Sequence, residues 1–203
     1  MLSPANAAGI RAKRLFNPGA RFELAQRLRS SGAPLGEVFS FISGLYFRGK
    51  LAYAERFADP PAGVAGVHVI TAAGGLLPPQ DLVTLPRLQA ISATRVDAEN
   101  PEYRGPLERD IRRLKATLEG GTQVILLGSI ATPKYVEPLL EVFGESLLFP
   151  KDFVGRGDMS RGGLLLRSSS SGSPLACVPV FNAARSGPRP AKLSRLKRPG
   201  RKT

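Results

Sequence analysis

Cysteine, histidine and tryptophan are nearly missing from this sequence, which holds one Cys, one His and no Trp in 203 residues. With Cys177 as its one cysteine, the chain forms no intramolecular disulfide, in agreement with a reducing cytoplasm. One histidine and one cysteine also exclude a structural zinc site. Because His68 lies inside an apolar run, a histidine-based catalytic triad is not expected.

Long hydrophobic runs are missing as well. No stretch of about 18 apolar residues occurs, so no transmembrane helix is expected, and the first residues have no apolar segment typical of a secretory signal. Hydrophobic residues still make up 42% of the chain, and the mean hydropathy is −0.07. These values predict a soluble, cytoplasmic protein with a sizeable core.

Acidic residues are scarce at both ends of the chain. Residues 1–30 carry six basic side chains and one acidic, and residues 185–203 carry eight basic and none acidic, so the body between them is formally neutral although the net charge is +13. We expect a flexible basic leader over 1–19, one domain over 20–184 and a disordered basic tail over 185–203. Such ends can bind nucleic-acid phosphates without reading sequence; alternatively, they are solvated ends with no specific role.

Hydrophobic periodicity and turn residues predict the secondary structure. Helices are expected over 21–29, 35–58 (a pair broken near Gly44 or Gly49), 88–91, 104–118 and 133–142, and strands over 67–71, 123–127 and 147–149. Segments 164–167 and 175–180 are expected to form a hairpin. The alternation predicts a single layered α/β domain with a mainly parallel central sheet, flanked by helices and completed by this late antiparallel hairpin.

The run FVGRGDMSRGG, residues 153–163, has the richest side-chain chemistry of the chain. Its glycines allow backbone N–H groups to converge on an anion, and its arginines can add bidentate contacts to phosphate or carboxylate. Asp158 is the candidate catalytic acid or base. The candidate ligand-binding residues are Gly155, Arg156, Gly157, Ser160 and Arg161. The alternative is a structural loop in which Asp158 pairs with an arginine.

The run LLGSIATPKY, residues 126–135, places a loop between an expected strand and an expected helix. Ligands of open α/β sheets bind outside the carboxyl ends of strands, where helix N-termini attract anions. Candidate ligand-binding residues here are Gly128, Ser129, Thr132 and Lys134. The spacing is not that of a Walker loop, and Thr132 as a helix cap with Lys134 at the surface is an equal alternative.

The run SGLYFRGKLAY, residues 43–53, combines two tyrosines with two cations. Arg48 and Lys50 could hold a phosphate beside a stacked base, which makes them the last two candidate ligand-binding residues. An aromatic stripe at helical spacing is more often part of a core. In that case Arg48 and Lys50 are the residues expected to reach solvent.

Three segments, FISGLYFRGKLAYA, VILLGSIATPKYVEPLL and FVGRGDMSRGGLLLR, resemble a bacterial family of uncharacterised proteins, a likeness that covers roughly residues 20–180. The segment VITAAGGL, together with LYFRGKLAYA, is similar to small α/β proteins related to nucleobase- and nucleoside-processing enzymes, although the catalytic signature of a glycosylase is missing. The resemblance implies a nucleotide-like ligand.

Two functions follow as hypotheses. The first is an enzyme that binds a nucleotide, nucleoside or nucleic-acid base, or another anionic small molecule, at the glycine- and arginine-rich loops, with Asp158 as acid, base or ribose-holding group. No cluster of metal ligands is expected, although Mg²⁺ bound through a carboxylate and a substrate phosphate is compatible with the sequence. The second is a non-catalytic nucleic-acid-binding protein that acts through its basic termini.

Overall fold

The computed structural model describes residues 1–193, and these residues form mixed helical and strand structure. Helices supply most of the ordered backbone. They are α1 (Ile10–Phe16), α2 (Glu23–Ser30), α3 (Leu35–Ser43), α4 (Leu45–Phe57), α5 (Leu85–Ala93), α6 (Pro101–Thr117), α7 (Pro133–Phe143) and α8 (Asp158–Ser171), with 3₁₀ turns η1 (Gly144–Ser146) and η2 (Lys151–Phe153). The strands are short: β1 (Ala33–Pro34), β2 (Val69–Thr71), β3 (Gly75–Leu77), β4 (Leu82–Val83), β5 (Val124–Ile125), β6 (Leu147–Pro150) and β7 (Cys177–Pro179).

The strands pair in three small sheets. β1 pairs with β4 and β2 with β3, both antiparallel, and β6 pairs in parallel with β5 and antiparallel with β7. The chain start links two of these sheets, because Leu2 makes a parallel bridge to Val69 on one side and to Leu127 on the other. Among the described strands only the β5–β6 pair is parallel, so the expected mainly parallel central sheet is not what they show.

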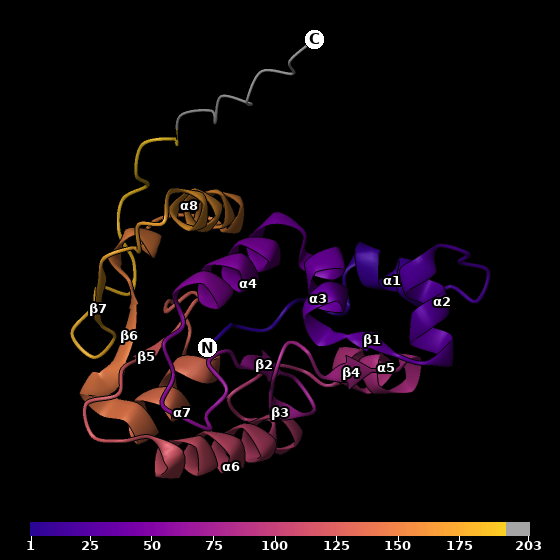
Figure 1. Ribbon diagram of the computed structural model, residues 1–203, viewed down its shortest axis with the longest axis horizontal. Coiled ribbons are helices and arrows are strands. Elements are labelled where there is room, and N and C mark those ends of the chain that lie inside the picture. The colour runs from indigo at the N-terminus through magenta and orange to yellow at the C-terminus, as the bar shows by residue number, and fades with distance from the viewer. Residues whose placement is uncertain (194–203) are drawn as a thin grey trace.

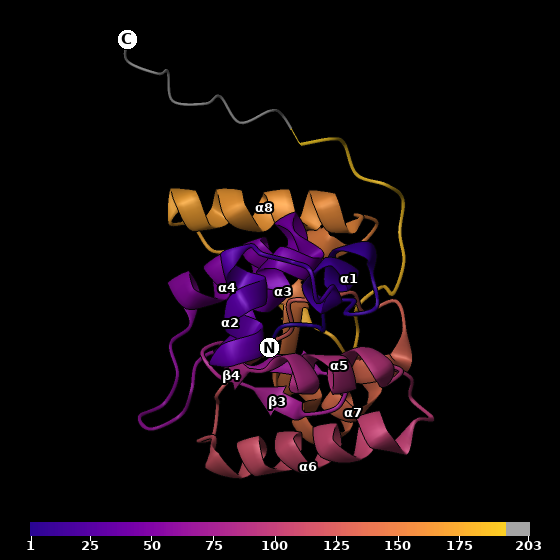
Figure 2. The same ribbon diagram turned by 90° about the vertical axis from the view of Figure 1, so that its right-hand side faces the viewer.

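Helices lie on both sides of these strands (Figure 1). In two views at right angles, α8 lies outside α4 on one side and α6 lies on the opposite side, with α7 next to it (Figure 2). The N-terminus lies between these layers, in the middle of the molecule. A single cluster of buried side chains runs through the fold, from Leu2 and Leu15 near the start to Leu165 and Val180 near the end.

The N-terminal segment is the main departure from the expected domain organisation. Leu2, Ala12 and Leu15 are fully buried, and α1 lies within residues 1–19. Residues 1–19 are therefore packed into the core instead of forming a separate leader, because this short stretch places apolar side chains at positions that the sheet and α3 cover. Of the expected tail, residues 185–193 are described, and 194–203 lie outside the described residues.

The expected late hairpin is wrong. Residues 164–167 belong to α8, a helix that continues through the serine run to Ser171 and ends at Gly172, which has φ of +69°. Ser170 Oγ donates to the carbonyl of Leu166 at 2.8 Å within the helix, whereas Ser169 Oγ donates to the carbonyl of Ala52 on α4 at 2.8 Å. β7, the other expected arm, pairs instead with β6. The helix pair in 35–58, broken at Gly44, and the helix beginning at Pro133 are confirmed.

Candidate functional site

Helices α4 and α8 cross with their backbones in contact, and the candidate site lies around this crossing. A Cβ atom on Gly49 would lie 2.7 Å from the carbonyl oxygen of Gly162, and one on Gly162 would lie 2.8 Å from the carbonyl oxygen of Leu45. Only glycine allows helices to approach this closely. The crossing brings the middle of α4, with its tyrosine and lysine, next to the first turn of α8.

Lys50 lies buried at this crossing with 1% of its surface exposed. Its Nζ donates hydrogen bonds to the carbonyl oxygen of Ser3 at 2.6 Å and to Ser3 Oγ at 3.0 Å. The ammonium also lies 4.7 Å from the ring centroid of Tyr46 and 4.8 Å from that of Phe47, in reach of cation–π attraction. Sequence reasoning expected this lysine to reach solvent, whereas the close helix crossing covers it.

Burial lowers the pKa of Lys50 to about 7, and the negative charge of Asp158 acts in the opposite direction. The cause is desolvation, which disfavours the charged ammonium. Near neutral pH the amine therefore exists in both protonation states, as a group suited to proton transfer does. Its direct partner is a serine hydroxyl, which can receive or give up a proton.

The loop that follows β5 packs closely against Ser3, and Gly128 and Tyr135 make this packing possible. The Tyr135 hydroxyl donates to the carbonyl oxygen of Ser129 at 2.7 Å. A Cβ on Gly128 would lie 2.7 Å from Ser3 Cβ and 3.1 Å from the Tyr135 hydroxyl. Burial raises the pKa of Tyr135, which a hydrogen bond with Ser3 partly offsets. Two distant segments of sequence thus meet at Ser3, and glycine at position 128 permits the approach.

The Tyr46 hydroxyl is buried beside the same cluster. Burial raises its pKa, and the nearby Arg161 guanidinium acts against this rise. Within residues 1–193, no group is placed to form a hydrogen bond of normal geometry with this hydroxyl. A buried polar group without a partner is costly, and such groups are often found at functional sites.

Asp158 and Arg161 form the outer part of the cluster. Asp158 is the first residue of α8, its side chain is 70% exposed, and its Oδ1 lies 3.5 Å from Arg161 Nη1. Arg161 is largely covered: its Nε donates to the carbonyl oxygen of Phe153 at 3.1 Å, and its guanidinium lies over the Phe153 ring. Asp158 is therefore the solvent-facing acid of the site, and its negative charge influences the pKa of the buried Lys50.

The other residues of the 153–163 run serve mainly to hold the loop. Arg156 donates to the carbonyl of Asp152 at 2.9 Å, to Ser160 Oγ at 3.2 Å and to the carbonyl of Ala191 at 3.3 Å. Gly155 has φ of +71°, and a Cβ there would lie 2.1 Å from the carbonyl oxygen of Pro188. The segment before the end of the described chain thus covers Gly155, whereas Gly157 faces open space.

The candidates outside that run are less closely gathered. Arg48, Thr132 and Lys134 are exposed, and Ser129 is half-buried. Thr132 stands at the N-cap of α7 but its side chain makes no capping hydrogen bond. The structure therefore brings Gly128, Lys50, Asp158 and Arg161 into one cluster and leaves the exposed candidates around its rim or apart from it.

Ser3 and Tyr135 belong to the cluster although sequence reasoning did not select them. Ser3 lies in the segment expected to be a leader, and no motif surrounds it. Tyr135 was within the 126–135 run but carried no signal beyond its position after Pro133. Both acquire their place through long-range pairing, since Ser3 N donates to the carbonyl of Leu127 at 3.1 Å.

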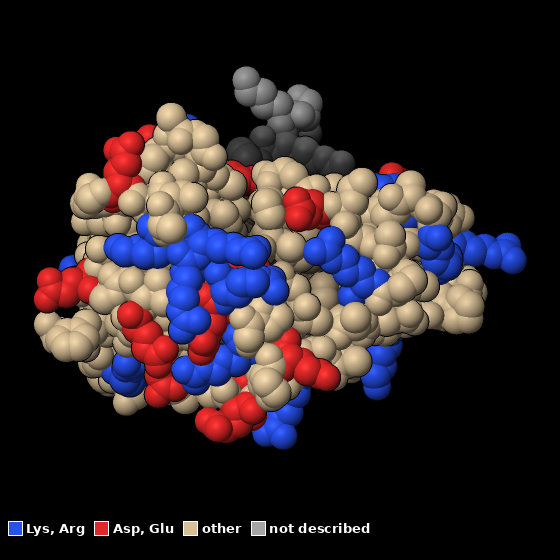
Figure 3. All heavy atoms as spheres, turned by 90° about the horizontal axis from the view of Figure 1, so that it is seen from below, with Lys and Arg blue, Asp and Glu red and all other residues tan. Residues whose placement is uncertain are grey.

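Charge on the face around α6 is mixed. Figure 3 shows Lys and Arg side chains interleaved with Asp and Glu over this helix. Arg104 pairs with Glu108 and, at 3.3 Å, with Glu141, and Arg112 pairs with Glu108 at 3.1 Å. Near the N-terminus, Arg27 is bound to Glu37 at 2.8 Å. These ion pairs balance part of the positive charge, and Figure 3 also shows Lys and Arg side chains that adjoin one another on this face.

Two further findings limit the chemistry of residues 1–193. This part of the chain contains no group of three or more His, Cys, Asp or Glu side chains placed to hold a metal ion. It also has no helix with the length and apolarity needed to cross a bilayer. Comparison with protein-family models, curated proteins and solved structures finds no match, so the geometry of the cluster carries the functional argument.

Proposed function

We propose that this protein is an enzyme that binds a nucleotide, nucleoside or nucleic-acid base at the cluster formed by Ser3, Lys50, Gly128, Asp158 and Arg161. The observation that carries the proposal is a lysine, Lys50, that is fully buried with a pKa near neutrality and is influenced by the charge of the exposed Asp158. Groups with perturbed pKa values next to an exposed partner are typical of active sites. In the proposal the enzyme is cytoplasmic, in keeping with its single cysteine.

Each part of the cluster has a role in this proposal. The exposed carboxylate of Asp158 exchanges a proton with the ligand or holds a ribose hydroxyl. Lys50 adjusts its protonation as the charge of Asp158 changes, and Ser3 is the hydroxyl through which its proton can move. Arg161 and the first turn of α8 offer positive charge to an anionic group.

The position of the Asp158 carboxylate leads to a prediction about Mg²⁺. A phosphate placed beside the first turn of α8 would be repelled by Asp158 at that same turn. A divalent cation between the two removes this repulsion, and Mg²⁺ commonly binds through one carboxylate and substrate phosphates. Nucleotides are therefore expected to bind with Mg²⁺, whereas nucleosides and bases need none.

The test is a thermal-shift screen of the full chain against nucleotides, nucleosides and bases, with and without Mg²⁺. A ligand at about 100 times its Kd adds about 2.7 kcal/mol of stability, which is readily measured. Asp158→Asn should abolish turnover of any ligand found and the Mg²⁺ dependence of nucleotide binding. Glu55→Gln on the exposed surface of α4 is the matched control, because it also removes one carboxylate.

Two results would overturn the proposal. Turnover that is unchanged in Asp158→Asn would show that Asp158 does not exchange a proton with the ligand. A blank screen, combined with binding of polyanions that weakens steeply with salt, would favour the alternative of a non-catalytic nucleic-acid-binding protein. The N-terminal cations are partly engaged in the fold, as Arg27 is with Glu37, so that alternative depends more on the C-terminal basic residues.

A further inference from the structure

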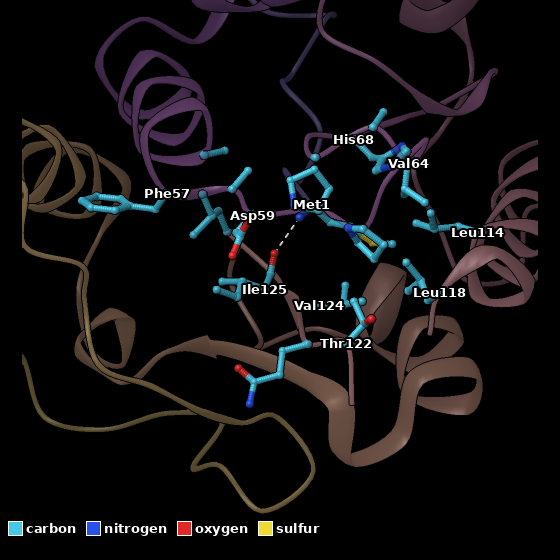
Figure 4. Close-up of a pocket in the computed structure, with 18 of the residues that line it drawn as sticks. Met1, Phe57, Asp59, Val64, His68, Leu114, Leu118, Thr122, Val124 and Ile125 are labelled. Atoms are coloured by element: carbon cyan, nitrogen blue, oxygen red, sulfur yellow. Dashed lines mark hydrogen bonds between the residues drawn. The ribbon is translucent and has the colours of Figure 1, made fainter. Parts of the chain in front are cut away.

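A cavity lies where β5 and the N-terminal segment begin, and none of the five residues of the proposed site lines it. This cavity measures about 590 Å³, within the range of small-molecule sites. Its walls come from the end of α4, the loop 58–68, the last turns of α6 and the start of β5. Figure 4 shows apolar side chains, among them Val64, Leu114, Leu118 and Val124, together with the amine of Met1, which donates to the carbonyl of Ile125 at 2.6 Å.

His68 is one of the residues that line this cavity. Its Nε2 is buried and has no hydrogen-bond partner within residues 1–193. The ring bonds to the carbonyl of Ala65, and burial, aided by the nearby N-terminal amine, lowers its pKa. A neutral imidazole that donates Nδ1–H to a carbonyl keeps Nε2 as an acceptor. Because Nε2 itself is covered, His68 contributes an uncharged ring to the cavity wall.

The charge of the lining is of one sign. Asp59 and Glu119 contribute carboxylates, and none of the described residues that line the cavity is Lys or Arg. Burial lowers the pKa of the Met1 amine to about 5, so this group is neutral at pH 7. An anion would meet only repulsion here, whereas a cation is attracted by both carboxylates.

We propose that this cavity binds a small amine that carries an aryl or branched alkyl group. The apolar part packs between Val64, Leu114 and Leu118, and Asp59 and Glu119 are the counter-charges of the ammonium. The ligand class is opposite in charge to the anionic ligand proposed for the Lys50 cluster. A failed test of one site therefore does not decide the test of the other.

The experiment titrates the full chain with three probes of similar size and different charge: 2-phenylethylamine, 2-phenylethanol and phenylacetate. Binding is followed by calorimetry and by amide NMR shifts of the residues around the cavity. We expect the amine to bind about tenfold more tightly than the alcohol, since exposed charge pairs contribute up to about 1 kcal/mol each, and the carboxylate not to bind. Equal binding of amine and carboxylate would overturn the proposal.

Variants decide where the amine binds. Ala65→Trp places a large ring at an exposed position of the cavity wall and should abolish binding. Ala62→Trp, at an exposed position of the same loop outside the lining, is the matched control and should bind normally. Asp59→Asn combined with Glu119→Gln should narrow the preference for amine over alcohol. Binding that survives Ala65→Trp, in a variant that melts like the parent, would place the amine elsewhere and refute the inference.

Discussion

Gly49 of α4 and Gly162 of α8 are in contact: a Cβ on Gly49 would lie 2.7 Å from the carbonyl oxygen of Gly162. More than one hundred residues separate them in sequence. The contact sets the distance between the two helices, and with it the position of Lys50 relative to Asp158. The candidate site therefore depends on the absence of a Cβ atom at both Gly49 and Gly162.

Gly49→Ala should destabilise the fold and separate the helices. The added methyl group cannot enter the space beside Gly162, and overpacking of this kind costs about 1–3 kcal/mol. Gly163→Ala is the control on α8, because its Cβ would meet only Leu193 Cδ1 at 3.5 Å. There, alanine should be neutral or stabilise the helix by about 0.5–1 kcal/mol. Urea unfolding of both variants measures the difference; equal effects would contradict the close packing.

Lys50→Met should remove a pH dependence of stability. The folded pKa of Lys50 is about 7 against 10.5 for the free side chain, so between these values the unfolded state binds more protons than the folded state. Stability contributed at this position therefore rises with pH from about 7 to about 10 and is constant below 7. The free energy of unfolding of the parent, minus that of Lys50→Met, should follow this course in chemical denaturation.

A difference between parent and Lys50→Met that stays flat from pH 6 to 10 would show that Lys50 titrates as an ordinary lysine. Subtracting the variant is essential, because the buried amine of Met1 and the buried tyrosines titrate in both proteins. Methionine is the suitable replacement because it has a similar length and no charge.

Asp158→Asn should lower the pKa of Lys50 further. The carboxylate favours the ammonium form, against the effect of burial, so its removal leaves desolvation unopposed. The Cε resonance of Lys50 in protein labelled with ¹³C-lysine reports the titration directly. Glu55→Gln should leave the curve in place. An unchanged Lys50 titration in Asp158→Asn would mean that the two groups are electrically independent, and would weaken the proposed active site.

Gly155→Ala should free the segment that covers the loop before α8. The residue has φ of +71°, and its Cβ would lie 2.1 Å from the carbonyl of Pro188, so alanine adds about 1–2 kcal/mol of backbone strain and pushes the segment away. Arg185, held by a hydrogen bond to the carbonyl of Ile130 at 3.1 Å, should then be cut faster by trypsin. Gly157→Ala, with φ of −81° and open space around it, should leave the cleavage rate unchanged.

Much of the local structure could be predicted from the sequence. Apolar spacing identified α4, and the turn before Pro133 identified α7, because helix starts and amphipathic faces are encoded within a few residues. The segment 164–167 was assigned to a strand because a short apolar run does not distinguish helix from strand. Its helical state follows from packing of α8 on α4 through Gly162.

Asp158, Arg161 and Gly128 were selected from their runs, but the cluster itself could not be foreseen. Ser3 has no motif, and its role arises because Leu2 pairs with Val69 and Leu127 in the interior. Long-range pairing of one residue with two distant segments leaves no local pattern in sequence. The same holds for the amine-binding cavity, whose walls come from three separate stretches of the chain: Met1, residues 53–68 and residues 114–127.

By itself, the sequence determined several of the helices, the lack of a second cysteine for an intramolecular disulfide, and the residue types available near the loops. Only the tertiary structure decided that Lys50 is buried against Ser3, that Asp158 faces solvent beside Arg161, and that the first residues contribute to the core. The physical reason is that burial, and the pKa changes it causes, depend on which distant segments exclude water from a side chain.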